Sequence, residues 1–124
     1  MSHFATYKAN VSSQKYLVKA LKEMGYEVEL NSTIKDYYGA NQTVQVAVAG
    51  KPLGFSWNKE QKKYDVIADW WGTGIREKDF CNLVSQLHEK YKVTDICKSK
   101  GLKVNKWTKL KDGSIQMVAT ESIY

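Results

Sequence analysis

Two alternating segments, LGFSWN at residues 53–58 and YDVIADW at residues 64–70, decide the fold. In each, apolar residues occupy every second position, and the residues between them are polar or small except for Ile67. This period of two is typical of a β-strand with one face buried. The connection at residues 59–63 is short and polar. The two segments therefore predict consecutive strands of an antiparallel meander.

The residues before this pair extend the sheet. Val44, Val46 and Val48 alternate in the same way, and the stretch 49–52, Ala-Gly-Lys-Pro, has the composition of a turn. Residues 26–30 also alternate, with Tyr, Val and Leu separated by two Glu. The intervening stretch 31–42 is less regular, and we interpret it as a loop flanked by strand ends. Together these segments predict an antiparallel meander.

A first strand and a first helix precede the meander. Residues 4–11 are rich in strand-forming types, and either Ser12 or Ser13 can cap a helix through its hydroxyl. Leu17, Leu21 and Met24 then recur at helical spacing, followed by a glycine at position 25 where a left-handed helix end belongs. The spacing therefore predicts a helix that ends at this glycine.

The C-terminal part predicts helix and then a hairpin. After residues 72–74 an apolar stripe at helical spacing comprises Phe80, Leu83, Val84, Leu87 and Tyr91. Residues 93–100 predict one or two further helical turns. Residues 102–110 and 114–120 predict a hairpin around Asp-Gly at 112–113, in a register that places Leu110 opposite Ile115 and Trp107 on the other face from Met117.

The predicted fold class is α+β, a single domain over residues 1–124. Helices that accompany a mainly antiparallel sheet usually cover one of its faces. We therefore expect a two-layer sandwich with two to three helices, a ferredoxin-like variant being one arrangement. The length of 124 residues and the hydrophobic share of 43% suit one ordinary domain.

No run of about 18 apolar residues indicates a membrane span, and two cysteines favour a reducing compartment such as the cytoplasm.

The formal charge of +6 is concentrated near the C-terminus. Residues 90–111 contain eight lysines and one aspartate, which gives +7, whereas the remaining 11 basic and 12 acidic residues give −1. Such asymmetry fits an anionic partner or a solvated lysine-rich face.

Several chemistries are disfavoured by spacing. Cys81 and His88 share a predicted helix face, but seven residues separate them by about 10 Å along the axis, too far for one zinc ion. Asp65 and Asp69 lie about 13 Å apart along a predicted strand, beyond the usual spacing of paired catalytic carboxylates. No glycine-rich phosphate loop is present. We therefore assign no catalytic residue, metal ligand or cofactor, and we expect a binding protein rather than an enzyme.

Two binding hypotheses remain, with an enzyme whose site is invisible in the sequence as a third. The first is docking to a protein partner, or to a second copy, through exposed aromatic residues, since aromatic side chains anchor interfaces. The second is sequence-independent binding of RNA or DNA through the lysine-rich stretch, although Arg76 is the only arginine. The candidate binding residues are Tyr38, Trp71, Lys98, Lys100, Lys103, Lys106, Trp107, Lys109 and Lys111, while Tyr37 also has a pattern that allows exposure.

Four segments together carry a family resemblance. These are MSHF at residues 1–4, LGFSWN at 53–58, YDVIADW at 64–70 and DGSI at 112–115. In this order they resemble the uncharacterised family typified by the hypothetical chloroplast reading frame thirty-five, and the likeness extends over the whole chain. The resemblance implies a single-domain protein of the cytoplasm or plastid stroma with no established activity, and it supplies no functional residues.

Overall fold

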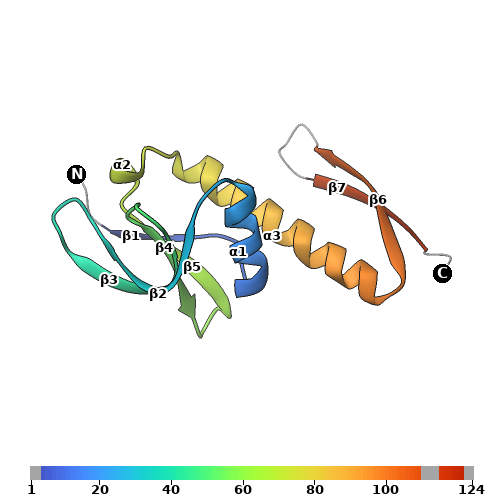
Figure 1. Ribbon diagram of the computed structural model, residues 1–124, viewed down its shortest axis with the longest axis horizontal. Helices are drawn as coiled ribbons and strands as arrows, with labels where there is room; N and C mark the ends of the chain where they lie inside the picture. The colour runs from blue at the N-terminus through green and yellow to red at the C-terminus, as the bar shows by residue number, and fades with distance from the viewer. Residues whose placement is uncertain (1–3, 110–114, 122–124) are drawn as a thin grey trace.

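The computed structural model describes residues 4–109 and 115–121, and the side chains of residues 4–101. Two helices lie against a curved sheet, and a separate hairpin follows the longer helix (Figure 1). The elements are β1 (Ala5–Lys8), α1 (Gln14–Glu23), β2 (Val28–Lys35), β3 (Asn41–Val48), β4 (Leu53–Asn58), β5 (Lys63–Ala68), α2 (Trp70–Thr73), α3 (Glu77–Ser99), β6 (Leu102–Lys109) and β7 (Ile115–Glu121).

The main sheet has the strand order β1-β5-β4-β3-β2, with every neighbouring pair antiparallel. Strands β2 to β5 form the predicted meander, and β1 joins it at the far edge, where Ala5 pairs with Ala68. The α+β prediction is confirmed. Four strands separate α1 from α2, so the element order differs from the βαββαβ order of ferredoxin-like folds.

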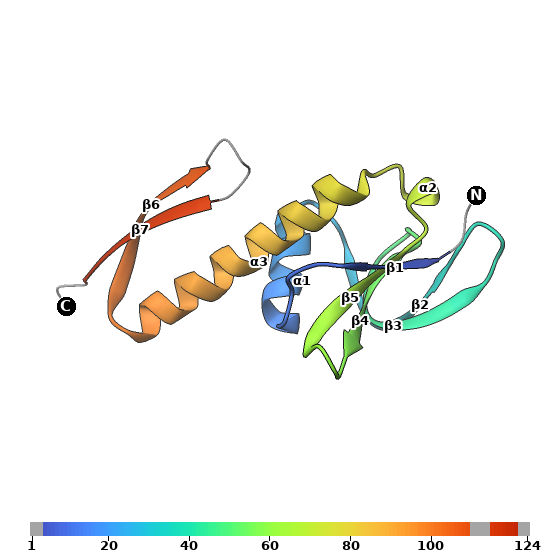
Figure 2. The same ribbon diagram turned by 180° about the vertical axis from the view of Figure 1, so that it is seen from behind.

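Both longer helices cover the same face of the sheet (Figure 2). Leu17 and Leu21 of α1 and Val84 of α3 are completely buried and belong to one apolar cluster with Phe55 of β4. Leu83, which was predicted to share this stripe, is instead 41% exposed. It lies on the side of α3 that faces away from the sheet, so only part of the sequence stripe forms the core.

The opposite face of the sheet is covered by its own β2–β3 hairpin. Ile34 and Val44 from the outer half of this hairpin are buried against Ala47 and Ile67. The loop predicted within residues 31–42 is confined to residues 36–40, because β2 continues to Lys35 and β3 begins at Asn41. Asn31 has a positive φ of 49° and interrupts the strand pairing. Because this bend lies among mainly polar residues, the strand lacks the apolar alternation from which it could be predicted.

Strand β5 ends earlier than its alternation predicts. Trp70 was expected to continue the strand, but it is the first residue of α2. The chain turns at Asp69, whose backbone N–H donates to the carbonyl of Pro52 at 3.0 Å. After Gly74, which has a φ of 68°, α3 begins and continues unbroken through the residues predicted as a separate turn or two.

The C-terminal hairpin forms a two-stranded sheet of its own, beyond the edge of the main sheet (Figure 1). Its predicted register is wrong by one residue: Ile115 pairs with Lys109, and Trp107 pairs directly with Met117. The predicted partner Leu110 and the Asp-Gly turn lie outside the described residues.

Candidate functional site

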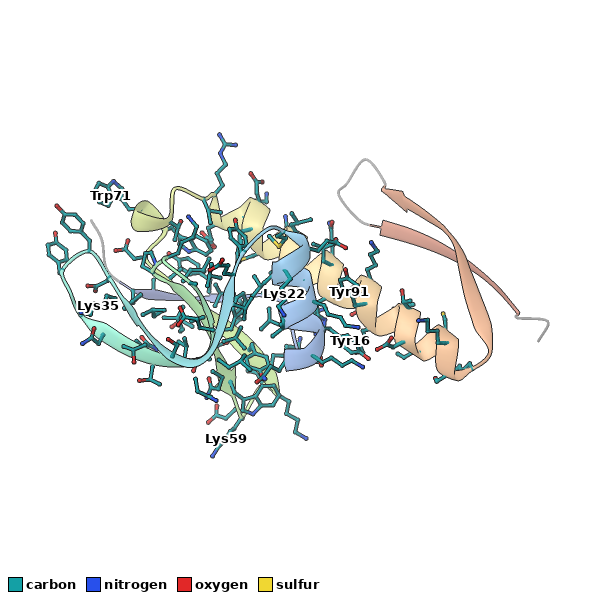
Figure 3. The ribbon with its side chains drawn as sticks, viewed as in Figure 1. Tyr16, Lys22, Lys35, Lys59, Trp71 and Tyr91 are labelled. Carbon is teal, nitrogen blue, oxygen red and sulfur yellow. The ribbon has the colours of Figure 1, made fainter. Side chains whose placement is uncertain are left out.

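The predicted binding residues are divided between two distant parts of the molecule. Trp71 projects from α2 at the end of the molecule opposite the C-terminal hairpin (Figure 3). Lys98 and Lys100 are exposed at the far end of α3, whose 23 residues correspond to a length of roughly 35 Å. Lys103, Lys106, Trp107 and Lys109 belong to β6, and Lys111 lies outside the described residues. Lysines and exposed rings therefore do not form one continuous surface.

The turn between β2 and β3 is held by an aspartate. One carboxylate oxygen of Asp36 accepts the backbone N–H of Tyr38 at 3.0 Å and that of Ala40 at 2.8 Å. The backbone N–H of Asp36 donates to the carbonyl of Ala40 at 3.1 Å, and Gly39 adopts a φ of 83°. Only glycine adopts such a conformation without strain. The turn is thus well determined, and it presents Tyr37 and Tyr38 outward.

A second aspartate connects this turn to α2. Asp69 immediately precedes α2 and is 1% exposed, and its Oδ2 accepts the backbone N–H of Tyr37 at 2.9 Å. Helix α2 is itself closed by Thr73, whose hydroxyl donates to the carbonyl of Trp70 and accepts the N–H of Ile75. Two segments far apart in the sequence are therefore fixed against each other.

These contacts assemble an exposed group of three rings, Tyr37, Tyr38 and Trp71, which we call the aromatic cluster. Their exposed fractions are 65%, 61% and 68%. The ring of Tyr37 lies 5.1 Å from that of Trp71 and 5.3 Å from that of Tyr38, in both cases nearly perpendicular. Beneath the cluster, Trp70 packs against Tyr7 and Phe80. The three rings thus project from a rigid base.

Sequence reasoning found the rings but not the residues that hold them. Tyr38, Trp71 and Tyr37 were singled out because their pattern allows exposure. Asp36 was overlooked, although an aspartate before Tyr-Tyr-Gly is a local signal for a side-chain-closed turn. Asp69 was weighed with Asp65 as a carboxylate pair, and either aspartate was expected to face solvent or to bind a neighbouring backbone N–H. Its contact with Tyr37 spans 32 residues, and no local pattern encodes such a contact.

A separate polar cleft of about 400 Å³ lies where β1 and β5 meet the first turns of α3. Its lining includes Lys8, Lys63, Asp65, Asn82 and the half-buried Cys81. Burial, with a smaller contribution from Glu77, raises the pKa of the Cys81 thiol to about 11. A thiol of that kind stays protonated at neutral pH and is a poor nucleophile. The cleft therefore offers a polar surface without an activated cysteine.

The buried histidine His88 holds the segment before α1 through hydrogen bonds. His88 is 1% exposed, and its Nε2 accepts the backbone N–H groups of Ser12 and Ser13 at 3.3 and 3.1 Å. The prediction that a serine hydroxyl caps α1 is wrong, because Ser13 makes no side-chain cap bond.

Among the described residues, no three His, Cys, Asp or Glu side chains are grouped so that they would hold a metal ion.

The polar contacts between α1 and α3 involve part of the lysine-rich stretch. Lys90 lies 3.6 Å from Glu23, which also accepts the hydroxyl of Tyr91 at 2.7 Å. Asp95 pairs with Lys15 at 3.2 Å, and hydrogen bonds from Tyr16 and Lys15 lower the pKa of its carboxyl. The first residues of the basic stretch therefore join the two helices rather than project freely.

A family profile described as a protein of unknown function (DUF1257) matches residues 20–118. The chain belongs to the DUF1257 family. No curated protein and no solved structure matches it. The matched region of this DUF1257 chain extends from α1 into β7 and includes the aromatic cluster, both aspartates beneath it and His88. No helix in the described part of the chain has the length and apolarity needed to cross a membrane.

Proposed function

We propose that this DUF1257 protein is a non-catalytic binding module that docks to another protein through the aromatic cluster. The observation that supports it is the combination of large exposure and rigid support. Tyr37, Tyr38 and Trp71 are each more than 60% exposed, yet hydrogen bonds to Asp36 and Asp69 fix the backbone that carries the two tyrosines. Rigid aromatic side chains lose little conformational entropy on binding, which is why they are enriched at interface hot spots.

Comparative affinity capture from the source cell tests the proposal. The baits are the unaltered protein, a variant with Tyr37→Ser, Tyr38→Ser and Trp71→Ser, and a control with Leu30→Ser. Leu30 is 52% exposed on β2 and lies outside the cluster, so its variant removes an exposed apolar side chain elsewhere. We expect the same specific partner with the unaltered protein and the control, and its loss with the triple variant. Retention by the triple variant would refute docking through the cluster.

Self-association is the second form of the same hypothesis. Sedimentation velocity of the unaltered chain over a range of concentrations distinguishes it. A concentration-dependent dimer that the triple variant fails to form identifies the partner as a second copy. A monomer throughout, combined with specific capture, identifies a different protein.

Sequence-independent nucleic-acid binding is a second candidate, favoured by a different observation. Lys98 and Lys100 are exposed at the end of α3, directly before the three lysines of β6. Binding of a mixed-sequence RNA should weaken steeply as salt increases, since counterions are released from the phosphates. Lys98→Glu with Lys100→Glu should reduce both the affinity and the salt slope. A flat salt dependence excludes this candidate.

Two finer assignments accompany the proposal. The sequence segments that resemble the chloroplast reading frame thirty-five family support placing the chain in that branch. Two cysteines without a disulfide between them, Cys81 and Cys97, support a reducing compartment, the cytoplasm or the plastid stroma.

A further inference from the structure

The aromatic cluster combines perpendicular ring faces with buried negative charge. Tyr37 stands at 88° to Trp71 and at 86° to Tyr38, so ring faces of different orientation meet at one exposed point. Ring faces attract cations, and groups of such faces bind ammonium ions. We propose that the cluster receives a lysine or arginine side chain of the partner protein, an inference that rests on the proposed docking function.

Two carboxylates bond to the backbone that carries the tyrosine rings. Asp36 is 9% exposed and Asp69 is 1% exposed, and each accepts the backbone N–H of a cluster residue, Tyr38 and Tyr37 respectively. Within the described residues neither carboxylate takes part in an ion pair, since the pairs found there are Lys15–Asp95 and Lys90–Glu23. Their negative charge therefore adds to the attraction that the ring faces exert on a cation.

The chain's own cations do not occupy this position. The Nζ of Lys51, which reaches α2, donates to the carbonyl of Thr73 at 3.4 Å rather than to a carboxylate. In the part of the chain with described side chains, lysines lie over the rings of Tyr16 and Tyr91, and not over those of Tyr37 or Trp71. Within the described side chains, no lysine therefore covers the ring of Tyr37 or Trp71.

The net positive charge of the chain does not oppose such a partner locally. The excess lies in residues 90–111, whereas the remainder carries −1. Lys98 and Lys100 lie at the C-terminal end of α3, roughly 30 Å along the helix axis from its first turn, and α3 follows α2, which carries Trp71 (Figure 3). The Debye length in physiological salt is about 8 Å, so the field of these distant lysines is largely screened at the cluster.

Binding of side-chain analogues tests the inference without knowledge of the partner. The probes are n-butylammonium for lysine and n-propylguanidinium for arginine, with neutral n-butanol as their matched control. The readout is the NMR shift of the Trp71 indole N–H, identified by its loss in Trp71→Phe. We expect saturable shifts at millimolar concentrations with both cations and a much weaker response to n-butanol. Equal responses to the cations and to n-butanol would overturn the inference.

Charge-neutralising variants separate the carboxylates from the rings. Asp36→Asn and Asp69→Asn keep an oxygen that accepts the backbone N–H but remove the charge, and each should weaken cation binding roughly three- to tenfold. Glu60→Gln, an equal charge change in the exposed β4–β5 turn, should leave it unchanged. Tyr37→Leu keeps an apolar side chain at a position that is 65% exposed, so the fold should be retained while cation binding, still read from the Trp71 indole N–H, is lost. Undiminished cation binding by Tyr37→Leu contradicts the inference.

The two proposals fail in different ways. If capture of the partner is lost in the aromatic triple variant but is unaffected in Asp36→Asn and Asp69→Asn, the cluster docks an apolar surface and only the cation inference is wrong. If the triple variant still captures the partner, the docking function itself is wrong. Loss of capture in both sets, with retention in Glu60→Gln, supports both proposals.

Discussion

The backbone N–H of Tyr37 donates a hydrogen bond of 2.9 Å to the carboxylate of Asp69, although 32 residues separate them in the chain. The donor lies in the turn between β2 and β3, and the acceptor immediately precedes α2. Because Asp69 is 1% exposed, water does not replace this contact easily. The bond therefore couples the position of the aromatic cluster to the stability of the fold.

Removal of the Asp69 carboxylate should destabilise the protein measurably. In Asp69→Ala the part-buried N–H of Tyr37 loses its acceptor, and a buried polar group left unsatisfied costs at most about 1–3 kcal/mol. Asp69→Asn retains an acceptor oxygen, so its loss should be smaller. Urea denaturation followed by circular dichroism measures both. An Asp69→Ala variant as stable as Glu60→Ala contradicts this role.

Acidification should destabilise the protein through His88. Burial lowers the pKa of its imidazole, and Nε2 accepts two backbone N–H groups only when it is unprotonated. The unfolded chain, with a histidine pKa of about 6.5, therefore binds more protons than the folded chain. Stability is complete above that pH and decreases as the pH falls below it. Urea midpoints measured from pH 7.5 to 5 should decrease accordingly.

His88→Gln supplies the control for this pH dependence. Glutamine does not titrate and carries an oxygen that accepts the same N–H groups. The variant should be less stable than the unaltered chain at pH 7.5 and should show a flatter decrease down to pH 5. Glu89 and Lys92, the charged groups that act on His88 from its own helix, remain in place. Identical slopes for the two proteins would show that His88 does not cause the decrease.

Local patterns were sufficient to predict most of the architecture. The meander, α1 and α3 follow from alternation and helical spacing, because in these elements a buried face repeats with the period of the backbone. The same argument failed for residues 31–42, where a bend at Asn31 and a mainly polar sequence conceal two continuous strands. It failed also at Trp70. The apolar alternation of the sequence continues to this residue, but the strand has already ended at Ala68, and the chain turns at Asp69, whose backbone N–H donates to the carbonyl of Pro52.

The candidate site was predicted only in part, for a physical reason. Exposure of Tyr38 and Trp71 follows from their place outside the alternating pattern. Their proximity depends on the contact between Tyr37 and Asp69, which is formed by the tertiary fold. The candidate lysines and the candidate rings are separated by the length of α3, a separation that no local sequence pattern encodes.

A close approach of two strands should make Gly54 sensitive to substitution. A Cβ added there would lie 2.6 Å from a methyl group of Val44 and 3.0 Å from the carbonyl oxygen of Val46. Overpacking of this kind typically costs about 1–3 kcal/mol, and we expect such a loss in Gly54→Ala. Val44→Ala added to Gly54→Ala removes the nearer contact, so the double variant should lose less than the sum of the single losses. Additive losses would place the strain elsewhere.

The Cys81 thiol should react slowly in the folded protein. Burial raises its pKa from 9.0 to about 11, so the thiolate fraction at pH 8 falls roughly a hundredfold. In a Cys97→Ser background, which leaves Cys81 as the single cysteine, alkylation by iodoacetamide should be correspondingly slower than in urea. The rate in the folded state should rise about tenfold per pH unit up to pH 10. A fast, pH-independent reaction near neutrality would instead indicate an activated thiol and would reopen the polar cleft as a catalytic site.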